Sequence, residues 1–261
     1  FLQRYVNGYI AAEKIDLIEA PDWTGISALM EFSCPLIIRM NGSDAYFCAL
    51  DGRKQKWKNH FFERMALKGA DGLISVSRFT ADKTREIFSL EKPIKIIPNS
   101  IDVNRFSTRE EEVVPNRILY YGSLIRKKGV LELAKIFNQV IKEVPQAELY
   151  LIGKDVQDIF EQRSTLELFK ENLSPQAAGQ VVYIPEVSYA EIGEHIGRAA
   201  VVVLPSFAEA LPMTWLEAMA MEKALVTSNI GWAKEVMIDG ETGYTVDPKD
   251  HQRSEERRVG K

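Results

Sequence analysis

The chain has 261 residues, of which 46% are hydrophobic and 27% are charged, and these proportions are ordinary for a globular protein. The formal net charge of −4 gives no reason to expect nucleic-acid binding, and the longest apolar runs are far shorter than a membrane span. The length allows one large domain or two small ones.

Cysteine and histidine usage predicts neither a disulfide framework nor a metal site. The two cysteines, Cys34 and Cys48, do not form a Cys-x-x-Cys pair, and no signal peptide is evident, so we expect packing thiols in a reducing cytoplasm. The histidines His60, His195 and His251 are not paired at metal-ligand spacing. We therefore predict a cytoplasmic protein without a metal.

Short β-rich apolar runs alternate with helical periodicity, which predicts parallel sheets built from βαβ units. A polar, charge-dense stretch at 109–116 ends in Pro-Asn and interrupts this alternation, as an interdomain linker does. The predicted fold class is α/β, with two Rossmann-like domains, 1–108 and 117–250, that face a cleft.

The expected elements follow from the same patterns. In the first domain, a helix at 5–13 precedes expected strands at 15–18, 35–40, 72–76 and 94–97 and expected helices at 25–32, 54–68 and 78–88. In the second domain, the expected strands are 118–121, 148–152, 181–184, 201–204, 225–227 and 244–246, and the expected helices are 130–144, 156–170, 189–198, 212–221 and 234–238.

Two carboxylates lie close together in sequence after an expected strand. Glu209 should lie on the loop that follows residues 201–204, and Glu217 should lie in the helix that Pro212 begins. In open α/β sheets the ligand crevice lies at the carboxyl ends of the strands, so both could reach a polyhydroxylated ligand there. The alternative is an exposed loop charge and an ordinary helix-surface residue.

A glycine turn with three cations follows the first strand of the second domain. Gly122 and Ser123 begin the turn, and Arg126, Lys127 and Lys128 precede an amphipathic helix. Glycine lets the backbone approach a ligand, while the helix N-terminus and the cations supply positive charge. This combination suits a diphosphate, although a solvated basic turn has the same composition. Gly153 ends the next strand and is a candidate neighbour of a nucleotide or a simple turn residue.

These motifs together resemble one enzyme family. The Glu209-x7-Glu217 spacing resembles the signature of retaining GT-B glycosyltransferases of family 4, and so do the Gly231, Asp239-Gly240, Gly243 and Asp247-Pro248 elements that follow in family order. The resemblance covers 15–250. It implies an acceptor-side first domain, of which only the C-terminal part is present, and a donor-binding second domain that lacks its last helices.

The resemblance also implies roles for the donor-side residues. Glu217 would accept hydrogen bonds from ribose hydroxyls and Glu209 would contact the transferred sugar, with the amides of Ala210 and Leu211 nearby. Pro212 departs from the family pattern and cannot donate an amide hydrogen bond.

The basic turn resembles the family element whose Arg and Lys hold the donor diphosphate. Lys128 matches the Lys, whereas Ser123 stands in the Arg position, and Arg126 is a candidate to compensate. On the acceptor side, Asn41 stands where the family usually carries His. An amide can hydrogen-bond a sugar hydroxyl, but it does not hold a proton charge near neutral pH.

The activity that the resemblance implies is transfer of a hexose from a nucleotide-diphosphate sugar to a hydroxyl of a glycan, lipid-linked or small-molecule acceptor, with retention and without a metal. It also implies cell-envelope polysaccharide synthesis and allows peripheral membrane contact. The donor is a substrate, and no cofactor is expected. The alternatives are a GT-B nucleotide-sugar epimerase and a noncatalytic nucleotide-sugar-binding fragment.

The two ends of the chain give rise to separate expectations. Phe1 is not an initiator Met, and residues 253–261 resemble a translated sequencing-library adapter, so we expect a fragment truncated at both ends with an artefactual tail at 251–261. A first domain without its early strands would expose a sheet edge and apolar surface. We therefore expect this fragment to be inactive by itself and prone to aggregation.

Overall fold

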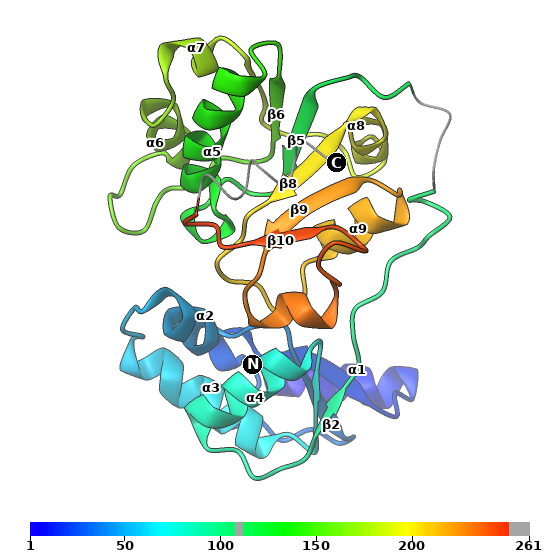
Figure 1. Cartoon of the computed structure of the whole chain (residues 1–261). Coiled ribbons are helices and arrows are strands. Elements are labelled where there is room, and N and C mark those ends of the chain that lie inside the picture. Colours follow the sequence, from blue (N-terminus) through cyan, green and yellow to red (C-terminus); the bar gives the residue numbers. More distant parts are fainter. Residues whose placement is uncertain (108–111, 251–261) are drawn as a thin grey trace. The chain divides into compact units, whose positions relative to one another are not determined.

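The computed structural model describes residues 1–107 and 112–250, and these form two compact α/β units. Unit 1 comprises Phe1–Asn99 together with Glu209–Leu211, and unit 2 comprises Ser100–Ala208 and the chain from Pro212 onward. Each unit contains a parallel sheet with its own helices (Figure 1), so the predicted α/β class is confirmed. Part of the predicted linker at 109–116 and the predicted tail at 251–261 lie outside the described residues.

Unit 1 is built on a four-stranded parallel sheet with the order β1-β2-β3-β4. Apolar residues that alternate along the strands bury one face of this sheet, and Leu36, Ile38, Met40, Leu67 and Phe88 lie in its core. The strands are β1 (Ile18–Pro21), β2 (Leu36–Met40), β3 (Gly72–Ser75) and β4 (Ile94–Ile96).

Polar caps begin two of the helices in unit 1. The Ser43 hydroxyl accepts a hydrogen bond from the Tyr46 amide, and the Ser77 hydroxyl accepts one from the Thr80 amide, so each serine is the N-cap of its helix. The helices are α1 (Leu2–Glu13), α2 (Asp44–Asp51), α3 (Trp57–Gly69) and α4 (Arg78–Phe88), and a 3₁₀ turn, η1, spans Trp23–Gly25.

Unit 2 contains a six-stranded parallel sheet with the order β10-β9-β8-β5-β6-β7. The chain builds outward from β5 in both directions, so the strand order reverses between β5 and β8 and creates a topological switch point. The strands are β5 (Arg117–Tyr121), β6 (Glu148–Ile152), β7 (Val181–Ile184), β8 (Val201–Leu204), β9 (Ala224–Ser228) and β10 (Tyr244–Val246).

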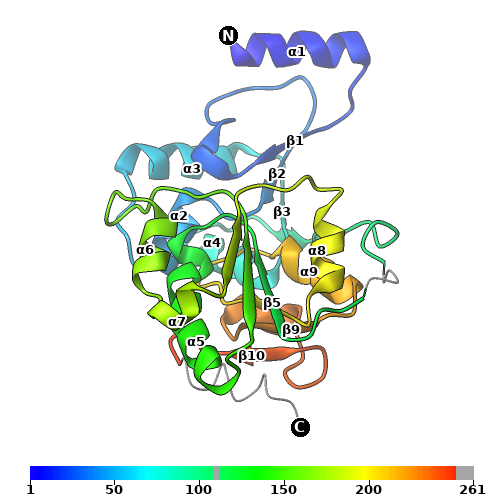
Figure 2. The same cartoon turned by 90° about the horizontal axis from the view of Figure 1, so that it is seen from above.

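Helices cover both faces of the unit 2 sheet, as parallel sheets require (Figure 2). One face carries α5 (Val130–Glu143), α6 (Thr165–Glu171) and α7 (Pro175–Ala178), and the other carries α8 (Ile192–Arg198) and α9 (Met213–Ala220). Two 3₁₀ turns complete the unit: η2 (Arg126–Lys128) and η3 (Gly231–Glu235).

Several expected elements differ from the observed ones. The helix expected at 25–32 is wrong, because Thr24, Gly25 and Leu29 adopt positive φ angles that a helix does not allow. The helix expected at 156–170 is confined to Thr165–Glu171, after a loop that precedes it. The strand expected at 15–18 begins only at Ile18, the helix expected at 234–238 is the 3₁₀ turn η3, and α2 was not expected.

Candidate functional site

Unit 2 contains a cavity of about 330 Å³ at the carboxyl ends of β5, β6 and β7. This is the sheet edge, beside the switch point, where α/β proteins bind ligands. Four of the residues predicted from sequence line it together: Gly122, Ser123, Gly153 and Glu217. The remaining lining residues are Tyr121, Ile152, Lys154, Pro185, Glu186, Val187, Ser188, Tyr189, Ile192 and Thr214.

Two glycines form the floor of this cavity. Gly122 and Gly153 have φ angles of +134° and +146°, and a Cβ atom on Gly153 would lie only 2.0 Å from the Gly122 carbonyl oxygen. The Gly122 amide donates to the Ile152 carbonyl at 2.9 Å, which holds the ends of β5 and β6 in register. Bare backbone is therefore exposed to whatever occupies the cavity.

The η2 turn brings the Lys128 side chain beside this floor. A Cβ atom on Gly122 would lie 3.5 Å from Lys128 Nζ. The turn is anchored by Gly129, which has a φ angle of +73° and whose Cβ position lies 2.0 Å from the Pro205 carbonyl oxygen. Helix α5 begins at Val130, so the ammonium group and the amides of a helix N-terminus occur in one short segment.

Glu217 lies in α9, and its residue is only 5% exposed. Its Oε1 atom accepts a hydrogen bond from the Tyr189 hydroxyl at 3.1 Å. Burial raises the pKa of Glu217, while the hydrogen bond from Tyr189, the nearby Tyr121 hydroxyl and the charge of Lys128 partly oppose that rise. A half-satisfied carboxylate at a cavity wall is well placed to accept further hydrogen bonds from hydroxyl groups.

Tyr121 supports Glu217 from β5. Its hydroxyl donates to the Thr214 carbonyl at 2.5 Å, at the start of the helix that carries Glu217. Burial, followed by the negative charge of Glu217, raises the pKa of Tyr121 well above its usual value. Tyr121 is therefore neutral, and its hydrogen bond links β5 to α9.

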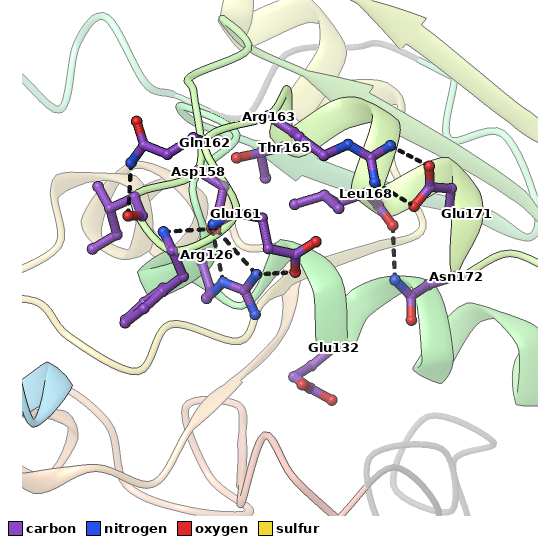
Figure 3. A network of polar contacts seen from close by, with 12 residues as sticks. Arg126, Glu132, Asp158, Glu161, Gln162, Arg163, Thr165, Leu168, Glu171 and Asn172 are labelled. Carbon is purple, nitrogen blue, oxygen red and sulfur yellow. Dashed lines mark hydrogen bonds and ion pairs between the residues drawn. The ribbon is translucent and has the colours of Figure 1, made fainter.

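Arg126, expected as a second phosphate ligand, is bound elsewhere (Figure 3). Its Nε donates to Asp158 Oδ2 at 2.7 Å, and one of its terminal nitrogens donates to Glu161 Oε1 at 2.8 Å. The hydrogen bond to Asp158 raises the pKa of the guanidinium. Arg126 does not line the cavity, whereas Ser123 does, so in this structure Arg126 does not take the place that Ser123 leaves without a cation.

The residues expected around the transferred sugar fall in the other unit. Glu209, Ala210 and Leu211 group with unit 1, and none of them lines the cavity. Glu209 is half-buried and Ala210 is 6% exposed. Their proposed contacts with a donor therefore remain predictions.

Asn41 lies in unit 1, directly after β2, and is exposed. Its backbone N–H donates to Asp22 Oδ1 at 3.1 Å. Asp22 is 1% exposed; burial raises its pKa to about 7, with the Asn41 hydrogen bond opposing this rise and the charge of Glu63 adding to it. The side chain of Asn41 remains available to an acceptor hydroxyl, and its role there stays a prediction.

The sequence analysis did not assign Tyr121 and Tyr189 to the wall of the cavity, whereas Lys154, which follows the expected site residue Gly153, does line it. Tyr121 ends β5, and its position at the carboxyl end of an apolar strand was the available signal. Tyr189 lies in a turn, and its contact with Glu217 joins residues far apart in sequence, so no local pattern indicated it.

A second depression, of about 480 Å³, lies at the opposite edge of the sheet. Its lining includes Ala224 and Tyr244, the first residues of β9 and β10, so it faces the amino ends of the strands, where this fold class does not place ligands. Within the described residues, no group of three or more His, Cys, Asp or Glu side chains is arranged to hold a metal ion. Across 1–107 and 112–250, no helix combines the length and apolar character that crossing a membrane needs.

Two family models match adjacent parts of the chain. The model described as "Glycosyl transferases group 1" matches residues 103–257, which is more than half of the chain. The model described as "Glycosyltransferase Family 4" matches residues 1–105. The boundary between them lies close to the end of unit 1 at Asn99.

Relatives and solved structures agree with the family models. Glycogen synthase of Mycobacterium tuberculosis (strain ATCC 25618 / H37Rv) is 26% identical over 249 residues, which cover 90% of this chain and 57% of the synthase. Sucrose-phosphate synthase from Thermosynechococcus elongatus has a TM-score of 0.78 at 20% identity over 99% of this chain and 67% of that one. Anabaena Alr3699/HepE in complex with UDP-glucose has a TM-score of 0.73 at 19% identity over 98% of this chain and 70% of that one. The structural likenesses show the GT-B type of α/β fold that the sequence predicted.

Proposed function

The chain belongs to the glycosyl transferases group 1 family, and we propose that its second unit binds the nucleotide-diphosphate sugar donor of a retaining hexosyltransferase. The chain spans 57% of the length of the glycogen synthase that it resembles, and the transfer activity of a whole enzyme is therefore part of this proposal. The first unit would bind the acceptor, which is a glycan, a lipid-linked glycan or a small molecule. The reaction would take place in the cytoplasm.

The observation that carries the proposal is the convergence of three features in one cavity of unit 2. The bare backbone of Gly122 and Gly153 forms the floor, the Lys128 ammonium lies beside it, and Glu217 is set in the wall. The amides of Gly122 and Gly153 already donate to the Ile152 and Ile184 carbonyls, so a diphosphate would receive amide hydrogen bonds from the N-terminus of α5 and a cation from Lys128. The hydroxyls of a ribose need a hydrogen-bond acceptor, and Glu217 offers one. The Anabaena Alr3699/HepE structures are complexes with UDP and with UDP-glucose, which supports this class of donor.

The chemistry follows from the charge that develops on the donor. As the bond between the anomeric carbon and the phosphate oxygen breaks, the leaving nucleoside diphosphate gains negative charge. Lys128 and the helix N-terminus of α5 would stabilise that charge without reorganising. The acceptor oxygen then bonds to the anomeric carbon on the same face, and its proton passes to the leaving phosphate oxygen. No metal takes part in this scheme.

Arg126 leaves this scheme with fewer cations than the family pattern implies. Because Asp158 and Glu161 bind its guanidinium, Lys128 and the backbone amides would carry the diphosphate charge. A charge-assisted hydrogen bond contributes about 1.5–3 kcal/mol, so affinity for the donor should depend strongly on Lys128.

Substitution of Glu209 tests the proposed transfer reaction. If Glu209 contacts the sugar, Glu209→Gln should lower turnover by about tenfold or more while nucleoside diphosphate affinity stays within about twofold. Proton NMR of the product, formed from an α-linked donor, should show the α anomer. An inverted product, or conversion of the donor to an epimer without any acceptor, would contradict the proposed reaction.

A further inference from the structure

The outer face of α3 in unit 1 carries an aromatic stripe where a surface helix ordinarily carries polar residues. Glu63, Ala66 and Leu67 point into the unit and are buried. Trp57 and Phe61 are spaced four residues apart on the other side, 72% and 44% exposed. Phe62, 41% exposed, packs its ring edge to face against Phe61 with 5.5 Å between centroids. Exposed aromatic clusters of this kind mark interaction surfaces.

The exposed charges that α3 and the residues just before it carry all have one sign, and the carboxylates near this segment include Asp51, which pairs with Arg53, and Asp44, which accepts from Asn59. The only carboxylate between residues 52 and 69 is Glu63, which is fully buried. Lys58 lies over the Trp57 ring, with its Nζ 5.8 Å from the ring centroid. The exposed charged residues of the segment are Lys54, Lys56, Lys58, Arg64 and Lys68. The chain as a whole has a formal net charge of −4, so this segment is basic within an acidic protein.

The neighbouring turn extends the apolar part of the surface. Gly25 packs directly on α3, since a Cβ atom there would lie 2.3 Å from the Phe62 carbonyl carbon. The Thr24 amide also donates to Glu63 Oε1 at 3.2 Å. On either side of this anchored turn, Trp23 and Ile26 are 48% and 51% exposed. The turn is thus fixed to the helix that carries the aromatic stripe.

We propose that the exposed face of α3, with the lysines that precede it, docks unit 1 on a membrane surface rich in anionic lipid. Aromatic side chains at the solvent face favour the interfacial region of a bilayer, where their rings leave water. Lysine and arginine side chains that flank them reach the lipid phosphates. A second copy of the chain is a poorer occupant, because it would bring two sets of like charges together. This docking is independent of the donor chemistry proposed for unit 2.

Binding of the 261-residue chain to vesicles tests the proposal. The chain should sediment with vesicles of mixed phosphatidylcholine and phosphatidylglycerol, bind pure phosphatidylcholine much more weakly, and be released by salt. A lysine near an anionic surface contributes about fivefold in affinity, so Lys56→Gln/Lys58→Gln should weaken binding by about 25-fold. Trp57→Ser/Phe61→Ser should weaken it by about tenfold or more, because the buried apolar area is lost.

A matched pair of lysines on unit 2 controls for overall charge. Lys142 and Lys170 are also exposed, and their replacement by Gln should change vesicle binding by no more than about twofold. Circular dichroism checks that the variants fold, and the lysine pair decides the outcome if the aromatic pair does not. Equal binding to neutral and anionic vesicles, no binding, or an equal loss in the control pair would overturn the proposal. A dimer that Trp57→Ser/Phe61→Ser dissociates would assign the face to a second copy and overturn it too.

Discussion

Gly153 determines how closely the ends of β5 and β6 approach at the floor of the cavity. Its φ angle of +146° lies where residues with a side chain are strained, and its Cβ position overlaps the Gly122 carbonyl oxygen at 2.0 Å. Gly122 has a similar φ of +134°, but its Cβ position meets only the side chains of Lys128 and Tyr120, at ordinary contact distances. Alanine at Gly122 would therefore introduce backbone strain alone, whereas alanine at Gly153 would introduce both strain and an overlap with the backbone.

Gly153→Ala should reduce the free energy of unfolding of unit 2 by at least about 3 kcal/mol, because strain and overlap add. Gly122→Ala should cost about 1–3 kcal/mol from strain alone. Urea unfolding followed by tryptophan fluorescence measures both. Equal costs for the two variants would show that β6 moves away without penalty and that the close approach is not required.

Asp22 makes the stability of unit 1 depend on pH. Its pKa rises from 3.8 to about 7, chiefly because it is buried, and its Oδ2 atom has no hydrogen-bond partner. The folded state therefore binds this proton more tightly than the unfolded state does. The stabilisation is present in full below pH 4 and is lost as the pH rises through about 7.

Asp22→Asn should remove this dependence, because the amide resembles the protonated acid and still accepts from the Asn41 amide. Between pH 4 and pH 8 the wild type should lose roughly 4 kcal/mol more than the variant, which is the free energy that a pKa change of this size represents. Chemical unfolding at both pH values measures it. Asp16→Asn, at an exposed position, is the control and should follow the wild type. Parallel pH profiles for Asp22→Asn and wild type would contradict the assignment.

At the scale of elements, one buried carboxylate organises the loop between β6 and α6. Asp158 accepts hydrogen bonds from Arg126 and from the amides of Phe160 and Glu161 (Figure 3). Burial raises the pKa of Asp158, but Arg126 and these two amides outweigh it and hold the pKa below its usual value. The loop therefore has a fixed shape without regular secondary structure.

Asp158→Asn should loosen this loop and cost about 2 kcal/mol, since two charge-assisted hydrogen bonds to Arg126 lose their anion. Hydrogen exchange at the Phe160 and Glu161 amides should accelerate markedly. Glu161→Gln is the matched control, because it removes an exposed partner of the same guanidinium and should cost no more than about 0.5 kcal/mol. Unchanged exchange in Asp158→Asn would mean that the loop is held by packing alone.

The elements that sequence patterns predicted are those with a strong local signal. The apolar runs that became β5, β6 and β8 and the amphipathic α5 match expectation closely. Helix α2 was not predicted because part of its N-terminal cap is distant in sequence: the Glu63 carboxylate accepts hydrogen bonds from the Asp44 and Ala45 amides. The helix expected at 156–170 failed for a similar reason, since Asp158 and Arg126 meet only in three dimensions.

At the scale of the whole molecule, the sequence predicted the fold class and much of the candidate site. Family motifs indicated Gly122, Gly153 and Glu217, and the cavity of unit 2 brings these three together. Sequence patterns could not indicate that Arg126 donates to Asp158 or that the Tyr189 hydroxyl donates to Glu217, because both hydrogen bonds join residues that are distant in sequence. The division into units also follows contacts, with Ser100 already in unit 2, earlier than the predicted linker at 109–116.

Calorimetric titration of the chain with UDP and with GDP tests the central claim, that the cavity of unit 2 binds a nucleotide-diphosphate donor. Lys128→Ala should weaken binding of the preferred nucleotide by about tenfold or more, and Glu217→Gln should weaken it by a similar factor. Lys127→Ala is the matched control, because Lys127 is adjacent in the same turn, whereas it is the Lys128 ammonium that lies beside Gly122 at the cavity floor; the affinity of Lys127→Ala should stay within about threefold. Wild-type affinity in both Lys128→Ala and Glu217→Gln, or an equal loss in Lys127→Ala, would contradict the claim.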